Sequence, residues 1–507
     1  MTDRLPHFAT AALALALAFL AFWYGYAAIA FVAAVIATVA FFAAVFSPPQ
    51  FIPPRGNILS IGSAHLPEND FCRHGIVVGQ PGVGKTEFAR RLLIQLVRNA
   101  PDFGALITDE KGDMHILVTQ VLGATGAMDK LVVLRPRMFG EKGERPAFRM
   151  NLIGDRSISW QSHAQLIVDT AVSQGQKTSQ AHFKTQAIDR MAEAMETIHL
   201  AGLVVTIPAI YEFIKFPELF DLTLEKMMNR EFSDPELKER AQILCDGWKQ
   251  YCAKAPEELS GIRGTIENYT NAYLEPEVSE VFCAIDPTVS INALDGGKVL
   301  LVSIPQQYIR ARKYIQAFCK ILYYRDSLGR FDKFGADGMT KLNLHVGLFD
   351  EGHNSLLASE EGYSDFNTLD KMRSARCPVW FLMQCYTSAL PTLEHESKLD
   401  VLKAVIGTHV IFRLSSEKGH KLSAGVIGEH EVQEISRSVS RGVTTISRTP
   451  KTKPVLGTWI FRKLADFHAI VRHPSDQRDY HHAHLPPLTN DGKHVARWYW
   501  RKRLGLA

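Results

Sequence analysis

The residues from Gly79 to Glu87 have the types and spacing most suited to chemistry. They include the pattern G-x-x-x-x-G-K-T, which follows the apolar stretch Ile76–Val78 and precedes an amphipathic run beginning at Phe88. This strand, loop and helix context is typical of a P-loop. Glycines admit backbone angles closed to other residues, so successive N–H groups can point at phosphate oxygens near a helix N-terminus. The segment therefore predicts nucleotide binding.

Each position of this loop receives an expected role. Lys85 should meet the β and γ phosphates and so act in catalysis, and the Thr86 hydroxyl should be a ligand of the metal. We predict ATP and Mg²⁺ as cofactors. The residues expected to contact the nucleotide are Gly79, Gly82, Val83, Gly84, Lys85, Thr86 and Glu87.

Two apolar strands end in Asp-Glu, "ALITDE" at Asp109 and "HVGLFDE" at Asp350, and they cannot both be the hydrolytic pair. RecA-like motor ATPases insert a strand before the Asp-Glu strand and place a polar sensor at the tip of the strand after it. The later pair fits, since "RCPVWFLMQ" follows it and ends at Gln384. We predict that Asp350 holds the Mg²⁺ shell, Glu351 polarises the attacking water and Gln384 senses the γ-phosphate. The alternative for Glu351 is a solvated carboxylate at a strand end.

Arginines near these strands are candidates for a finger donated to a neighbouring subunit. Arg373 and Arg376 precede the Gln384 strand, and Arg413 lies on "HVIFRL". A surface ion pair explains each of them equally well.

The length and composition of the chain limit the kinds of domain that can carry these residues. A chain of 507 residues is too long for one ordinary core. The net charge of +4 neither demands nor excludes a nucleic-acid partner. The seven cysteines form no C-x-x-C pair and no zinc spacing, so they predict reduced, mostly buried thiols in a cytosolic domain.

Residues 8–47 contain no charge. One bilayer crossing needs about 20 apolar residues, so we predict two helices near 8–25 and 29–47 that turn at "WYGY". A removable signal peptide would explain only the first. A hairpin returns the chain to its starting side, and ATP is cytoplasmic, so we predict a multi-pass membrane protein with both termini and the ATPase domain in the cytoplasm. The following "PPQFIPPRGN" reads as a semi-rigid linker.

The apolar spacing from about 156 to 284 is helical, and the strand-like "KVLLVSIP" at 298–305 resumes the sheet. The expected fold is α/β: a RecA-like P-loop ATPase core with an inserted all-α domain and an N-terminal two-helix transmembrane hairpin. The predicted divisions are the hairpin at 1–50, the nucleotide-binding domain at 51–155 and 285–475, the substrate-recognition helices at 156–284, and a basic, aromatic tail at 476–507.

This order of parts resembles the TraG/TraD-like coupling proteins of type IV secretion and conjugation, over roughly residues 10–460. The resemblance rests on the membrane helices, the P-loop, a D-x-K-G-[DE] segment (Asp109, Lys111, Gly112, Asp113), the helical insertion, "DGGKVLLVSIP", "LFDE", the glutamine strand and "GTHVIFRLSSEKGHKLSAGVIGEHEVQEISRSVSRG". The chain departs from the family in "DEGHN", in "GQPGVGKT" and in a short C-terminal part.

The resemblance implies a homo-hexameric ATPase at the bacterial inner membrane. Such a ring recruits relaxase-bound single-stranded DNA or effector proteins and hands them to the channel components of the secretion system. Two alternatives stay open: an FtsK-like DNA pump, whose longer linker and C-terminal winged domain are not evident, and a docking platform that nucleotide only assembles.

Three polar segments have more than one interpretation. The tail "KHVARWYWRKRLGLA" suits single-stranded nucleic acid, a partner or membrane surface, or a helix docked on its own protein. The basic stretch 438–454 could touch phosphates in a pore or form a flexible hairpin. "HHAH" at 481–484 could ligate metal, although a solvated loop explains it without one.

Overall fold

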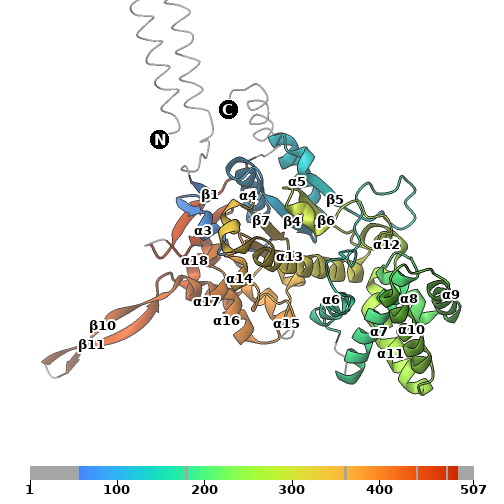
Figure 1. Ribbon diagram of the computed structural model, residues 1–507. Coiled ribbons are helices and arrows are strands. Elements are labelled where there is room, and N and C mark those ends of the chain that lie inside the picture. The colour runs from blue at the N-terminus through green and yellow to red at the C-terminus, as the bar shows by residue number, and fades with distance from the viewer. Residues whose placement is uncertain (1–55, 177–180, 359–361, 441–442, 476–477, 489–507) are drawn as a thin grey trace, which may run out of the picture. The chain divides into compact units, whose positions relative to one another are not determined.

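The computed structural model describes residues 56–176, 181–358, 362–440, 443–475 and 478–488 (Figure 1). The predicted membrane hairpin over 8–47 and the tail from 493 lie outside these ranges. Among the helices that the structure describes, none has the length and apolar character needed to cross a membrane.

A nine-stranded sheet forms the centre of the described chain. Its strands are parallel except at one edge, where β12 runs antiparallel to both β9 and β13. The order across the sheet is β13 (His481–His484), β12 (His468–Arg472), β9 (Thr408–Ile411), β3 (Gly75–Val78), β8 (Val379–Met383), β7 (His345–Phe349), β4 (Gly104–Asp109), β6 (Val299–Ser303) and β5 (Leu131–Leu134).

Both faces of the sheet are covered, as expected for parallel strands that are apolar at nearly every position. Val77 and Trp380 point into a core shared with α4 (Lys85–Asn99) and α5 (Met114–Thr125). Phe349 and Phe381 point into the opposite core, shared with α13 (Ile309–Gly338), a long helix broken at Gly335. All seven cysteines lie in the described ranges; none forms a disulfide and five are buried, as predicted.

Seven helices lie between β5 and β6, in the stretch predicted as all-α (Figure 1). Local capping explains several of their starts: Asp234 accepts a hydrogen bond from the amide of Glu236, and Pro235 occupies the first turn. The helices are α6 (Trp160–Ser173), α7 (Ala181–Leu200), α8 (Ile207–Lys215), α9 (Pro217–Met228), α10 (Pro235–Cys252), α11 (Pro256–Thr270) and α12 (Pro276–Phe282).

Shorter elements complete the described chain. A two-stranded sheet of β1 (Asn57–Ile61) and β2 (Ala64–Pro67) packs on the α4 side. The short helices are α3 (Glu68–Phe71), α14 (Leu369–Met372), α15 (Leu390–Leu393), α16 (Glu396–Val405), α17 (Glu417–Ile427) and α18 (Thr458–Lys463).

The basic stretch 438–454 belongs to a β-ribbon. β10 (Glu429–Ser440) pairs antiparallel with β11 (Val443–Pro454) over twelve residue pairs, from Glu429 with Pro454 to Ser440 with Val443 (Figure 1). This ribbon forms a sheet of its own.

The structure moves one predicted boundary. The "HHAH" segment, predicted to be a solvated loop inside a tail that starts at 476, is strand β13 at the edge of the main sheet. Alternate side chains point to opposite faces of a strand, so His481 is buried while His482 and His484 stack with His468.

Candidate functional site

The P-loop lies at the carboxyl edge of the sheet, between the ends of β8 and β9. The amide of Gly79 donates to the Met383 carbonyl at 3.2 Å, and that of Gln80 donates to the Arg413 carbonyl at 3.0 Å. Gly84 has φ +120°, and a Cβ there would lie 3.0 Å from Phe467, so this turn requires glycine. Within the described part of the chain, the amides of Gly82, Val83 and Gly84 have no hydrogen-bond acceptor, so they are available to an anion.

Lys85 begins α4 and is 6% exposed. Its ammonium donates to the carbonyls of Gly79 at 2.5 Å and Gln80 at 3.2 Å. Burial lowers the pKa of Lys85 to about 8, although the nearby carboxylates of Glu351 and Asp350 act in the opposite direction. A cation is thus held at the loop, in front of the acidic residues of another strand.

The other predicted loop residues differ in their exposure and in their hydrogen-bond partners. Thr86 is exposed at the start of α4, as a metal-binding hydroxyl requires. Val83 is buried and its carbonyl accepts from the amide of Phe467. Glu87 accepts from the amide of Leu488 at 2.7 Å and lies 3.4 Å from Arg90, so its carboxylate is engaged with the segment after β13.

Asp350 and Glu351 follow β7 and are 7% and 3% exposed. Glu351 adopts φ 43° and ψ 46°, a left-handed conformation that is uncommon for a residue with a side chain. Burial raises the pKa of Asp350 to about 7; the Lys111 ammonium opposes this rise, and the carboxylate of Glu351 adds to it. One buried oxygen of Asp350, Oδ2, has no hydrogen-bond partner among the described residues.

The strand order brings Gln384 to Glu351. β8, which ends just before Gln384, lies between β3 and β7. The Gln384 amide is exposed and donates to Glu351 Oε1 at 3.5 Å, the outer limit for a hydrogen bond. Four residues from three separate parts of the chain therefore meet at one edge: Lys85, Asp350, Glu351 and Gln384.

The earlier Asp-Glu pair lies at the same edge, because β4 is hydrogen-bonded to β7. Its two carboxylates are already engaged. Asp109 accepts from Gly112, Met114, His115 and Ser303 at 2.7–3.3 Å and so fixes the start of α5. Glu110 lies 3.0 Å from Arg312 on α13.

Two residues between these elements were not predicted as site residues. Lys111 lies 2.5 Å from Glu351. Asp113 forms a group with Asp109 and Asp350 whose carboxylate oxygens lie within 4.8 Å of one another, close enough to share a cation. The D-x-K-G-[DE] segment was the sequence signal that could have placed both residues here.

The three candidate arginines lie in different places. Arg373 and Arg376 precede β8 at the amino edge of the sheet, opposite Gln384, and Arg376 pairs with Glu68 at 2.8 Å. Arg413 follows β9 beside the P-loop and pairs with Asp466 at 2.6 Å. A finger role toward a neighbouring subunit stays a prediction.

No family model matches the chain, and no curated protein matches it. Several solved structures, however, match the chain. The unbound conjugative coupling protein TrwB superposes with a TM-score of 0.56 at 15% identity, over 85% of this chain and 88% of that one. The described chain has the fold of TrwB. The predicted resemblance to conjugative coupling proteins and the mixed α/β P-loop ATPase fold are thus confirmed.

Two further TrwB structures carry nucleotides. TrwB with the non-hydrolysable ATP analogue ADPNP gives a TM-score of 0.56 at 15% identity, over 84% of this chain and 88% of that one. TrwB with ADP and Mg²⁺ gives 0.54 at 14% identity, over 86% and 91%.

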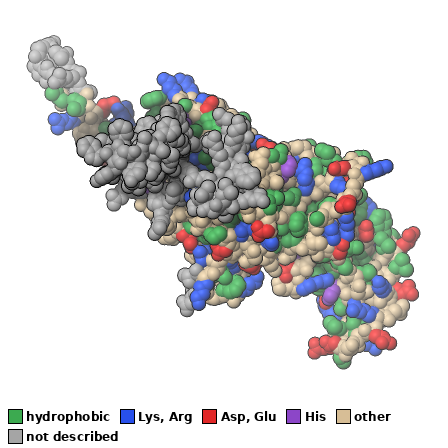
Figure 2. Space-filling model, turned by 90° about the horizontal axis from the view of Figure 1, so that it is seen from above, with side chains coloured by type: hydrophobic (Ala, Val, Ile, Leu, Met, Phe, Trp, Pro, Cys, Tyr) green, Lys and Arg blue, Asp and Glu red, His purple; other side chains and the backbone are tan. Residues whose placement is uncertain are grey.

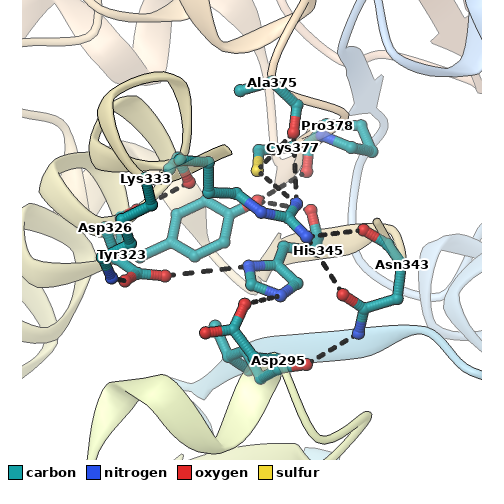
Figure 3. Close-up of polar contacts among 12 residues, drawn as sticks. Asp295, Tyr323, Asp326, Lys333, Asn343, His345, Ala375, Cys377 and Pro378 are labelled. Carbon is teal, nitrogen blue, oxygen red and sulfur yellow. Dashed lines mark hydrogen bonds and ion pairs between the residues drawn. The ribbon is translucent and has the colours of Figure 1, made fainter. Parts of the chain in front are cut away.

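A second cluster of ionisable groups lies at the amino edge of the sheet, where β7 begins. Figure 3 shows the His345 ring between two carboxylates: Nε2 lies 3.3 Å from Asp295 and Nδ1 lies 3.8 Å from Asp326. These three residues could hold a metal ion. However, each ring nitrogen faces a different carboxylate, and Arg330 and Lys333 already place positive charge beside the cluster. The arrangement fits an imidazolium that anchors β7.

This cluster predicts a pH-dependent stability. Burial lowers the pKa of His345, but the carboxylate of Asp295 and the thiol of Cys377 raise it more, and the net shift is upward. The stabilisation is therefore full below pH 6.5 and is lost as pH rises through the raised pKa. Between pH 6 and 8.5 the wild type should lose stability relative to His345→Asn, measured by thermal unfolding.

His409→Asn is the matched control. Burial lowers the pKa of His409 to about 3, so this buried imidazole stays neutral across the same pH range. The unfolded chain takes up a proton at His409 below about pH 6.5 and the folded chain does not, so this histidine destabilises the wild type at the acidic end of the range. Its replacement should therefore shift the pH profile in the direction opposite to that of His345→Asn. Parallel pH profiles for the wild type and His345→Asn would contradict the imidazolium assignment.

Proposed function

We propose that this protein is an inner-membrane ATPase that uses ATP hydrolysis to recruit and deliver DNA or protein substrates to a type IV secretion or conjugation channel. The observation that carries the proposal is the meeting of Lys85, Asp350, Glu351 and Gln384 at one sheet edge, in a chain with the fold of TrwB.

The residues present fit a nucleotide with Mg²⁺. The free amides of Gly82–Gly84 and the ammonium of Lys85 suit phosphate oxygens. Burial, and after it the nearby carboxylates of Glu351 and Asp113, raise the pKa of Asp350, and a bound cation would oppose both effects. TrwB binds ADPNP, and ADP with Mg²⁺. When bound, Mg²⁺ would neutralise phosphate charge, held by Asp350 and Thr86.

Each side chain then has a task. Lys85 exchanges its bonds to the loop carbonyls for phosphate oxygens. Glu351 orients the attacking water and accepts its proton, as a buried carboxylate at a strand end can do. Gln384, which already reaches Glu351, reports whether the γ-phosphate is present.

The transport substrate, partners and location follow the family resemblance. We propose relaxase-bound single-stranded DNA or effector proteins as substrates, selected by helices α6–α12, and a homo-hexamer that meets the secretion channel at the inner membrane. Figure 2 shows basic and acidic side chains interspersed over the described part of one face, in keeping with a nearly balanced net charge. Overall charge therefore does not distinguish DNA from protein cargo.

Hydrolysis with and without single-stranded DNA tests the choice of substrate. The purified full-length chain should hydrolyse ATP several-fold faster with DNA at low salt. The gain should shrink at higher salt, because phosphate contacts release counterions.

The other outcomes have different meanings. Hydrolysis that is indifferent to DNA at both salt concentrations would contradict DNA as the cargo and favour protein effectors. A chain that binds ATP and never hydrolyses it would contradict the motor and favour the docking platform.

A further inference from the structure

Among the described residues, Lys111 makes the shortest polar contact to the side chain of Glu351. Its ammonium lies 2.5 Å from Glu351 Oε1, and it comes from the turn between β4 and α5. The lysine side chain is 43% exposed, whereas that of Glu351 is 4% exposed. A residue at the surface thus reaches the buried carboxylate proposed to activate water.

The turn that carries Lys111 is held on both sides. On one side, Asp109 accepts from the amides of Gly112 and Met114. On the other, the carbonyl of Glu110 accepts from the Gln306 side chain at 2.6 Å. These hydrogen bonds define the backbone at Lys111 in this arrangement, so the contact with Glu351 does not depend on a freely flexible segment.

The contact occupies one of the two carboxylate oxygens that a base could use. A general base must accept a proton from water at about 2.6–3.2 Å. Oε1 of Glu351 already faces Lys111 at 2.5 Å and Gln384 at 3.5 Å. Oε2 is buried without a hydrogen-bond partner among the described residues and lies 3.6 Å from His353. In this arrangement Glu351 is paired with a cation and poorly placed to receive a proton.

Lys111 has other anions within reach. Burial lowers the pKa of Lys111, but Glu351, Asp350 and Asp113 raise it more, so the lysine is held as a cation among three carboxylates. The ammonium could leave Glu351 for Asp113, which is exposed on the same turn.

A continuous set of contacts joins this turn to the helical insertion. Tyr273, in the turn after α11, packs edge-on against Tyr314 and Phe318 of α13 at 6.1 and 6.2 Å. Two residues from Tyr314, Arg312 pairs with Glu110, the neighbour of Lys111. A displacement of the helices would therefore move the residue beside Lys111 through packed side chains.

We propose that Lys111 is a positioning residue that restrains Glu351 and so keeps ATP hydrolysis slow until the β4–α5 turn moves. The inference rests on the proposed ATPase function and adds a brake to it. Lys111 pairs with the carboxylate proposed to activate water, and this ion pair breaks when the turn shifts.

The test compares ATP hydrolysis by full-length chains in the absence of DNA or protein cargo. Lys111→Ala should raise kcat at least about threefold with little change in KM, because the barrier falls without a change in phosphate contacts. Lys111→Arg should restore the slow rate, since a guanidinium can pair with the same carboxylate. Lys111→Ala combined with Glu351→Gln should be inactive, which shows that the gain passes through Glu351.

Lys313→Ala is the matched control. This exposed lysine of α13 also acts electrostatically near the site, on Glu110 and His353, without a contact to Glu351. Its replacement should leave the rate unchanged.

Two results would contradict the proposal that Lys111 slows hydrolysis. In both, the wild type hydrolyses ATP, and Lys111→Ala hydrolyses it either at the same rate or more slowly. The failure of the proposed function has a different signature. In that case neither the wild type nor Lys111→Ala hydrolyses ATP, although both bind a fluorescent nucleotide analogue. Hydrolysis by Lys111→Ala alone would be the strongest support for the restraint.

Discussion

A Glu351→Gln chain should bind ATP with the affinity of the wild type and hydrolyse it at least about a hundredfold more slowly. Glutamine has nearly the same shape, so it can keep a hydrogen bond with Gln384 and fill the same buried position. It cannot accept a proton from water. The loss should therefore fall on kcat, measured by phosphate release at saturating ATP, with nucleotide binding measured separately by fluorescence.

Glu110→Gln is the matched control for this prediction. Both glutamates follow an aspartate at the end of neighbouring strands, and both are buried. Glu110, however, is bound to Arg312 and Asn354. We expect Glu110→Gln to keep hydrolysis by the folded protein within about tenfold of the wild type. It removes a buried structural ion pair, so its main cost should be a lower melting temperature. The reverse result, with Glu110→Gln inactive and Glu351→Gln active, would mean that the earlier pair hydrolyses ATP.

Lys85→Ala should weaken nucleotide binding by between about tenfold and a hundredfold, the effect of losing hydrogen bonds from a charged group to phosphate. Hydrolysis should fall with it. The fold should tolerate the change, because Lys85 donates its hydrogen bonds to the carbonyls of Gly79 and Gln80 on the loop itself. ATP with Mg²⁺ should therefore raise the melting temperature of the wild type and leave that of Lys85→Ala nearly unchanged.

Lys130→Ala is the control for the loss of a lysine that donates to a backbone carbonyl. Its ammonium binds the Gly297 carbonyl at 2.9 Å, away from the P-loop. This variant should keep both nucleotide binding and the rise in melting temperature. If Lys85→Ala still gained stability from ATP, the P-loop lysine would not be a phosphate ligand.

The P-loop could be recognised from the sequence because its parts are contiguous. Strand β3, the glycine turn and the start of α4 follow one another directly, and each obeys a local rule on apolar residues, backbone angles or helix starts. Two other features could be predicted for the same reason: the apolar strand before Asp350 and Glu351, and the helical spacing from 156 to 284. The order of these parts also supported the resemblance to coupling proteins, whose fold the structure has.

Tertiary structure alone decided which distant residues meet. The order of parallel strands depends on crossovers that no local pattern specifies, so the position of β4 beside β7 could not be read from the chain. That neighbourhood places Lys111 against Glu351 and Asp113 near Asp350. It also joins His345, at the start of β7, with Asp295 and Asp326 from two other segments.

The histidines of β13 show the same limit. Their sequence has little apolar character, so "HHAH" read as a loop; pairing with β12 made it a strand and buried His481. The sequence by itself determined the α/β class and the positions of the glycine-rich loop and of the two Asp-Glu segments, because these are local patterns. Only the folded sheet determined the partners of Glu351, because they come from strands that are adjacent in space and far apart along the chain.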